Sequence, residues 1–188
     1  MVCLSIPDKS KEEQIMLATF IAITAVVVAI ALWIISMQNK LVTLDENVKS
    51  AMSQIGVQVS SRFDALMAVL EIMKDYAKSE SEQIIETISA QRSMITAKST
   101  PDEVISQEEI ITEALDRIAI ITKQYPELKE NKTYITAMNA VLVFENMVRT
   151  SCMIYNDSVT KLNREIKMLP ASMISKMLGF RQRSYMEN

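Results

Sequence analysis

Polar side chains interrupt the apolar pattern of two long segments, and these side chains are the residues whose types and spacing could do chemistry. Arg62 and Asp64 lie in the first segment. The second segment carries a polar track made of Glu145, Asn146, Arg149, Asn156 and Asn163. Asn156 and Asn163 are one heptad apart and would share a helix face. We interpret the track as a strip that recognises a partner, as an interhelical ion-pair and amide network that fixes register, or as solvent-exposed positions.

Most catalytic chemistry is excluded by residue types that the sequence lacks. The chain has no histidine, which removes the usual general base, triad partner and zinc ligand. Two glycines cannot form a phosphate-binding loop. The acidic clusters are interpreted as solvated helix faces: Glu80, Glu82 and Glu86, and Glu108, Glu109 and Glu113. We therefore expect no enzymatic activity, no metal and no cofactor, and the net charge of -3 argues against nucleic acid as a partner.

The run from Ile15 to Met37 contains no charged residue and predicts a transmembrane helix. At 1.5 Å per residue it would reach about 35 Å, enough to cross the hydrocarbon core. It is too long for a cleaved signal peptide and continues without a small-x-small site. We expect a single-pass cell-membrane protein with a short segment over 1-14, the anchor over 15-37 and one domain over 38-188. Cys3 and Cys152 would lie on opposite sides of the membrane and could not pair.

The rest of the chain predicts an all-α fold, because 2 glycines and 4 prolines provide few turns. Apolar residues at three- and four-residue spacing continue the anchor into a helix ending near Lys78. Three more helices and a short final one are expected over 81-98, 101-124, 132-169 and 171-178. Thr100, Pro101 and Glu103 form a helix start, with Ser106 as an alternative cap. The order of these helices and the short connections between them favour an antiparallel up-down-up-down bundle.

Two details of this bundle are specific enough to be checked. Gly56 lies inside the first helix and is interpreted as the close approach of a neighbouring helix. The apolar stripe of the 81-98 helix is expected to include Met94 and Ile95. The stripe of the longest soluble helix is expected at Ile135, Met138, Leu142, Val148, Tyr155, Val159, Leu162, Ile166 and Leu169.

The C-terminal tail combines apolar and cationic side chains and would return to the membrane end of the bundle. Its candidate membrane-proximal residues are Met173, Ile174, Lys176, Met177, Phe180, Arg181 and Arg183. The tail either caps the open end of the bundle or lies in the headgroup layer. In the second case its cations suit an anionic cytoplasmic leaflet, which favours a cytoplasmic domain and an outside N-terminus. Lysines on both sides of the anchor do not decide its orientation.

These motifs, in this order, resemble the LemA family of bacterial membrane proteins. The resemblance is carried by Asn39–Glu46, Gln58, Arg62, Asp64–Leu66, Lys74–Ala77, Tyr125–Lys129, Glu145–Asn146, Tyr155–Asn156, Asn163, Pro170, Leu178–Phe180 and Tyr185. Departures occur at Met52 in place of Trp, Met67 in place of Pro, and Cys152–Ile154 in place of a basic run. The resemblance implies one transmembrane helix, a cytoplasmic helical bundle and no established enzymatic activity, with links to membrane organisation and membrane proteases.

Two functions are expected from these observations. The first is a non-enzymatic scaffold or adaptor on the lipid bilayer, which binds another membrane or cytoplasmic protein, or a second copy, through helix-helix contacts. The second is a sensor that binds a small ligand or ion and transmits a shift through the first helix. The sensor requires a cavity with convergent polar groups around Arg62, Asp64, Glu145 and Arg149.

Overall fold

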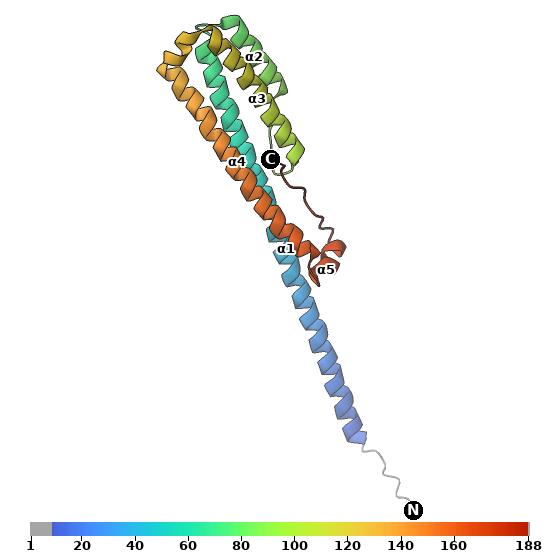
Figure 1. Ribbon diagram of the computed structural model, residues 1–188. Helices are drawn as coiled ribbons and strands as arrows, with labels where there is room; N and C mark the ends of the chain where they lie inside the picture. The colour runs from blue at the N-terminus through green and yellow to red at the C-terminus, as the bar shows by residue number, and fades with distance from the viewer. Residues whose placement is uncertain (1–8, 188) are drawn as a thin grey trace, which may run out of the picture.

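The first helix, α1, is continuous and includes both the candidate membrane-spanning segment and the first helix of the bundle. The structure is a computed structural model that describes residues 9-187. Helix α1 runs from Lys9 to Met73 without interruption, about 97 Å at 1.5 Å per residue (Figure 1). It ends a few residues before the expected Lys78, because Tyr76 and Ala77 donate their backbone N–H groups to the carbonyl of Met73 in a turn.

The apolar N-terminal half of α1 projects beyond the bundle (Figure 1). Its large apolar side chains from Ile15 to Ile35 are exposed, and none of its most apolar window is buried. A core helix of a soluble protein would bury such residues against its own domain. This helix is long and apolar enough to cross a membrane, and its exposure is consistent with a single-pass membrane protein.

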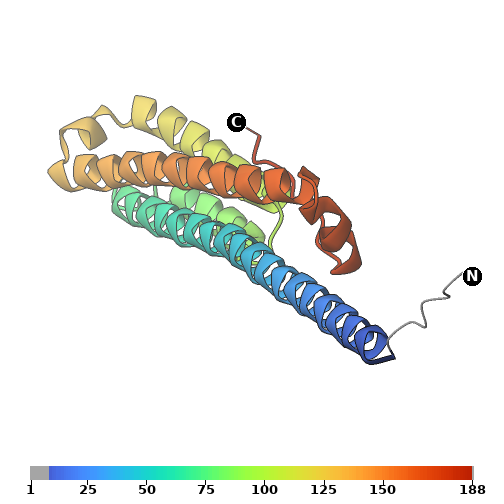
Figure 2. The same cartoon turned by 90° about the horizontal axis from the view of Figure 1, so that it is seen from below.

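Five further helical elements follow α1. They are α2 (Lys78–Gln91), α3 (Pro101–Gln124), the 3-10 helix η1 (Pro126–Glu130), α4 (Lys132–Lys167) and α5 (Ala171–Met177). No strand occurs in residues 9-187. Helices α2 and α3 lie on one side of the α1/α4 pair (Figure 2). The fold is therefore all-α, as expected.

Helices α1 and α4 pack antiparallel along the length of the bundle. Lys40 pairs with Glu165 at 2.8 Å near the membrane end, and Asn131 donates to the Tyr76 hydroxyl at 3.2 Å at the far end. Helix α2 in turn lies antiparallel to α3, since Gln107 on α3 bonds the carbonyl of Gln91 at the end of α2. These directions are compatible with the expected up-down-up-down order.

Buried positions on α1 and α4 recur every seven residues, the repeat of packed coiled coils. On α1 the series are Leu41, Val48, Ile55, Arg62 and Val69, and Met52, Val59, Leu66 and Met73. On α4 the main series is Tyr134, Val141, Val148, Tyr155 and Leu162. Arg62 is thus a charged residue at a core position.

The expected stripe of α4 is wrong at both ends. Ile135 and Leu142 are exposed, and their neighbours Tyr134 and Val141 are buried instead. Adjacent residues on a helix differ by about 100° around its axis, and both members of each pair are apolar, so the pattern alone cannot choose between them. Leu169 is also exposed, because α4 ends at Lys167.

Helix α2 ends at Gln91, seven residues before the expected Lys98. The backbone N–H of Ser93 donates to the Gln107 side chain at 2.8 Å, which holds the connector away from a helical path. Ile95 of this connector is buried against Gly56, where an added Cβ would lie 2.3 Å from the Ile95 carbonyl oxygen. Gly56 therefore marks the close approach of an extended connector and not of a helix, and Met94 is exposed and not buried.

The start of α3 agrees with its sequence signals. Thr100 is the N-cap and accepts a hydrogen bond from the Glu103 backbone at 3.3 Å, with Pro101 in the first turn. The alternative cap, Ser106, lies inside the helix. Glu108 lies about two turns after this start and pairs with Arg62 of α1.

Candidate functional site

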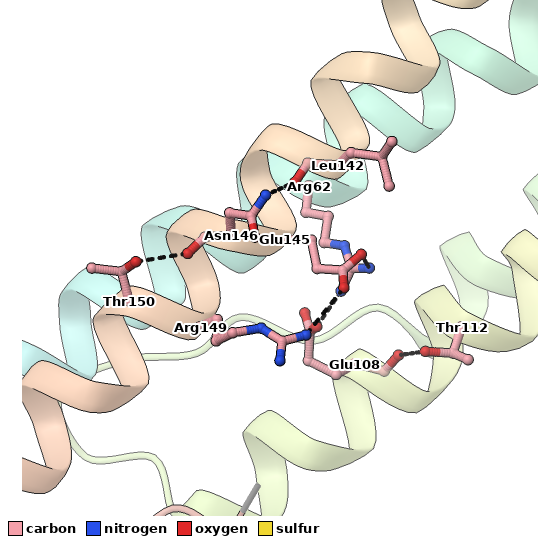
Figure 3. A network of polar contacts seen from close by, with 8 residues as sticks. All are labelled: Arg62, Glu108, Thr112, Leu142, Glu145, Asn146, Arg149 and Thr150. Carbon is pink, nitrogen blue, oxygen red and sulfur yellow. Dashed lines mark hydrogen bonds and ion pairs between the residues drawn. The ribbon is translucent and has the colours of Figure 1, made fainter.

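A groove of about 600 Å³ lies between α3 and α4, and Arg62 of α1 lies at its floor. Figure 3 shows the Arg62 and Glu145 side chains converging with Glu108 from the facing helix. Apolar side chains make up part of the lining: Val104, Ile105, Val148, Cys152 and Met186. The groove is therefore amphipathic, with a charged centre bordered by apolar side chains.

Arg62 joins three helices at this point. Its side chain is 5% exposed and donates from Nη2 to Glu145 Oε2 at 2.9 Å and from Nη1 to Glu108 Oε2. The other oxygen of Glu145 accepts from Arg149 at 3.4 Å. An arginine held in a core series needs such partners, because a buried unpaired cation would be strongly unfavourable.

The network leaves two buried atoms without a hydrogen-bond partner, namely Arg62 Nε and Glu108 Oε1. Burial raises the pKa of Glu108, and the negative charge of Glu145 raises it further. These two effects together outweigh Arg62, which lowers the same pKa. The groove therefore holds unused hydrogen-bonding capacity on both a donor and an acceptor.

The charge of the groove is negative. Carboxylates are contributed by Glu108, Glu109, Glu113, Asp116, Glu145 and Glu187. Arg62 and Arg149 are the cations in its lining, so six carboxylates face two guanidinium groups. Such a surface attracts cationic groups and repels anions. Within residues 9-187, no group of three or more acidic or cysteine side chains is arranged to hold a metal ion.

Cys152, the cysteine that lines the groove, has a thiol of low reactivity. Burial, together with the charge of Glu108, raises the pKa of the Cys152 thiol to about 11. A thiol with this pKa is protonated at neutral pH, and the protonated form is a poor nucleophile and a poor metal ligand. Cys152 contributes to the apolar surface of the groove.

Two asparagines of α4, Asn156 and Asn163, hold the C-terminal tail. Asn163 donates from Nδ2 to the Arg183 carbonyl and accepts from the Arg183 N–H, both at 2.9 Å. Asn156 donates to the Met186 carbonyl at 3.0 Å and accepts from the Met186 N–H at 2.8 Å. Each asparagine side chain thus pairs with both the N–H and the C=O of a single residue of the tail.

Side chains of the tail make further contacts with the bundle. Arg183 pairs with Asp45 of α1 at 2.8 Å, and the Tyr155 hydroxyl donates to the Ser184 carbonyl at 3.1 Å. Met186 is 5% exposed and lines the groove. Figure 1 shows the segment after α5 turning back along the bundle from the membrane end.

The polar track predicted from the sequence is divided by the structure. Arg62, Glu145 and Arg149 line the groove. Asp64 lies away from it and pairs with Arg92 at 2.9 Å. Asn146 is exposed and donates to the Leu142 carbonyl of its own helix. The expected cavity is therefore present around three of its four residues, and Asp64 is not among them.

The candidate membrane-proximal residues fall into two groups. In α5, Met173 and Met177 are 68% and 87% exposed and Lys176 is exposed. Arg181, in the segment after α5, is also exposed. Ile174, Phe180 and Arg183 face the protein instead: the first two are half-buried, and Arg183 pairs with Asp45.

Three residues of these sites were not identified from the sequence. Glu108 was assigned to a solvated face, which is wrong, since its side chain is 25% exposed and pairs with Arg62. The unpaired positive charge of Arg62 in a core series was a signal that a carboxylate had to face it. Asp45 and Met186 carried no such signal, because the position of the tail depends on how the chain turns after α5.

The chain was compared with known families and proteins. The model of the LemA family matches residues 51–188, which include the last part of α1, all of α4, the groove and the tail. The matched range begins after the anchor. No curated protein matches the chain.

Proposed function

The chain belongs to the LemA family, and we propose that it is a membrane-anchored scaffold or adaptor that binds a second protein in the groove between α3 and α4. The observation that carries this proposal is the groove itself. It is open, negatively charged and partly apolar, and its floor is held by a buried Arg62 that three helices share.

The lining suits a protein segment that carries both cationic and apolar side chains. Val148 and Ile105 offer apolar contact area, and the excess of carboxylates provides charge complementarity to a basic segment. The groove is bounded by helices and has a packed floor, so its shape is present before a partner binds. A preformed groove lowers the entropy cost of association.

The continuous α1 gives the groove a defined distance from the bilayer. Arg62 lies 25 residues after Met37, which is about 38 Å along the helix axis. The partner we propose is a membrane or cytoplasmic protein whose binding segment reaches that height. The lack of histidine and of a glycine-rich phosphate loop fits a function carried out by binding alone.

We place the bundle on the cytoplasmic face, with α5 against the membrane surface. Met173 and Met177 are exposed on this helix, which packs against α1 and α4 near the end of the span (Figure 1). Lys176 and Arg181 next to them suit anionic lipid headgroups. Labelling Cys3 with a membrane-impermeant thiol reagent in intact cells tests this orientation, and a protected Cys3 would contradict it.

Site-specific photocrosslinking in intact membranes tests the scaffold. A crosslinking amino acid at Thr112, which lines the groove, should trap a partner. Because the contact is electrostatic, the Glu109→Lys/Glu113→Lys variant should abolish that product. The matched Glu80→Lys/Glu86→Lys variant changes the same charge on α2 and should retain it. A strictly monomeric protein without charge-dependent products would refute the scaffold.

A sensor is the second candidate, and the unpartnered Arg62 Nε and Glu108 Oε1 favour it. These atoms could bind a small polar or cationic ligand within the negative groove. Thermal unfolding of the intact protein with added amines or divalent cations tests this. A rise in Tm that is lost in Glu108→Gln supports a sensor, and an unchanged Tm argues against it.

A further inference from the structure

The contacts between α4 and the tail have the form of peptide recognition. Asn156 and Asn163 are separated by seven residues of helix, a rise of about 10.5 Å. Arg183 and Met186, the residues they hold, are separated by three residues, about 10 Å in an extended chain. Because the two lengths agree, both asparagines pair with the same extended segment without distorting it.

This pairing recognises the backbone of the segment, so it carries little information about sequence. An asparagine side chain offers a donor and an acceptor, and a residue of an extended strand presents the complementary N–H and C=O. The same recognition of main-chain N–H and C=O groups occurs where a peptide adds to the edge of a sheet. Any extended segment without proline at these two positions could make these four hydrogen bonds.

Sequence selectivity comes from two side-chain subsites. Asp45 binds the guanidinium of Arg183 through Nη2 at 2.8 Å and Nε at 3.2 Å. Met186 enters the apolar end of the groove, near Val148 and Cys152. The two subsites together select an arginine followed, three positions later, by an apolar residue.

The tail occupies only part of the groove. It runs antiparallel to α4, from Asn163 past Asn156, so its direction up to Glu187 is towards the part of the groove lined by Val148 and Glu145. The groove continues in that direction to the Arg62 network. A longer segment in the same orientation would reach the carboxylates there, so basic residues after the apolar position would add favourable charge pairing.

The tail is attached to the bundle mainly by hydrogen bonds and one ion pair and has little buried apolar surface. Residues 181-185 are exposed, and in 181-187 Met186 is the one buried residue. Arg183 keeps 47% of its side chain accessible although it is paired. A segment held in this way can detach while the helices stay packed, since it contributes little to the apolar core.

We propose that α4 carries a binding site for an extended peptide of the form Arg-x-x-apolar, that residues 183-186 occupy it within the chain, and that a partner segment of the same form displaces them. This inference rests on the proposed scaffold function and names the class of segment that the groove binds. The tail then acts as a built-in competitor that sets the affinity a partner must exceed.

A competition experiment on the full-length protein in lipid nanodiscs tests the site. The probe is a fluorescent peptide with the sequence of residues 179-188. The Arg183→Glu chain, whose own tail is repelled by Asp45, should bind this peptide at least tenfold more tightly than the unmodified chain. The Arg181→Glu chain carries the same charge change two residues earlier and should show a much smaller gain.

Variants of the peptide and of the site identify the contacts. Peptides with Arg183→Glu or Met186→Asp should bind the Arg183→Glu chain at least tenfold more weakly, whereas Gln182→Ala should bind it equally well. Adding Asn163→Ala to the Arg183→Glu chain should remove binding. The Asp45→Arg chain, whose own Arg183 is then repelled, should bind the Arg183→Glu peptide more tightly than the peptide of unmodified sequence, which a general loss of structure would not do.

Hydrogen exchange on the unmodified chain gives an independent measurement. The amides of Arg183 and Met186 should exchange at least a hundredfold faster than those of Val159 and Leu162, and faster still with excess peptide. Equal exchange rates would show a tail that opens only with the whole bundle, and would overturn the proposal. So would an Arg183→Glu chain that keeps its helical content but fails to bind the peptide.

Two further outcomes separate this inference from the scaffold itself. If the charge-dependent crosslinks at Thr112 persist but the peptide neither binds nor displaces the tail, the scaffold stands and the peptide site is refuted. If sedimentation shows dimers in which copies exchange tails, the occupant is a second copy, and the proposed partner segment is overturned.

Discussion

Around Glu145, α4 meets α1 through charges and is linked to α3 by the shared Arg62, whereas around Asn156 and Asn163 it meets an extended segment through neutral amides. The first contact surrounds an almost completely buried guanidinium. The second satisfies backbone groups on a largely exposed tail. Two polar sites on one helix thus differ in what they bind and in how much solvent they exclude.

The difference explains why one site is suited to hold the bundle together and the other to exchange its occupant. Removing one member of a buried charge network leaves the others unpaired in a region of low dielectric, which is costly. When the tail leaves the asparagines, both the amides and the backbone can hydrogen-bond to water, so the net loss is small. We expect the consequences of mutation to follow this order.

The largest effect is expected for Arg62→Met. Without the guanidinium, Glu108 and Glu145 face each other without a cation between them, and the free energy of unfolding should fall by about 3 kcal/mol. Urea denaturation followed by circular dichroism measures it. The triple variant with Glu108→Gln and Glu145→Gln should recover most of the loss. A loss below about 1 kcal/mol would show that the network is effectively solvated.

A smaller effect is expected for Asn163→Ala, which removes both hydrogen bonds to Arg183. We expect a loss of about 1 kcal/mol in global stability, because the freed backbone gains water. Exchange of the Arg183 amide should rise much more than exchange in α4. Asn146→Ala is the matched control, since that side chain bonds only its own helix. Equal changes in the two variants would contradict the assigned role of Asn163.

Asp45→Asn should have a weaker effect still, below about 1 kcal/mol, because its pair with Arg183 is partly exposed. The expected result is faster exchange in residues 183-186 with an almost unchanged Tm. Glu46→Gln, one residue along, is a suitable control because its contact is with Lys49. A large fall in Tm would mean that the tail is part of the core.

The smallest effects are expected in the pH dependence of stability, where the two sites have opposite signs. The folded-state pKa of Glu108 lies above its ordinary 4.5, so protonation as the pH falls through that pKa should favour the folded state. Burial acts to raise the pKa of Asp45, but hydrogen bonds and charges of Lys49 and Arg183 outweigh it, so that pKa lies below 3.8.

The stabilisation from Asp45 should therefore be complete above its ordinary pKa and be lost as the pH falls through the lower folded-state pKa. Tm measured between pH 3 and pH 7 should show the Glu108 contribution above 4.5 and the Asp45 contribution below 3.8. Glu108→Gln should flatten only the first range and Asp45→Asn only the second. The reverse assignment would contradict the burial inferred for each carboxyl.

Much of the charged site was visible in the sequence, because Arg62 stands in a seven-residue apolar series that requires a partner. Its partner Glu108 was not, since three glutamates on α3 have similar surroundings in the sequence and only the angle at which α3 meets α1 selects one. The asparagine site was recognised as a shared helix face. Its occupant was not, because an extended tail has no periodic signal.

The sequence by itself determined the apolar helix long enough to cross a membrane, the all-α class, the start of α3 at Thr100 and the spacing of Asn156 and Asn163. These follow from local composition, capping and helical periodicity, which act over a few residues. Only the tertiary structure decided which apolar face of α4 is buried, where α2 ends, which glutamate pairs with Arg62 and where the tail lies. Each of these depends on packing between segments far apart in the chain, and adjacent apolar or acidic residues leave the local pattern degenerate.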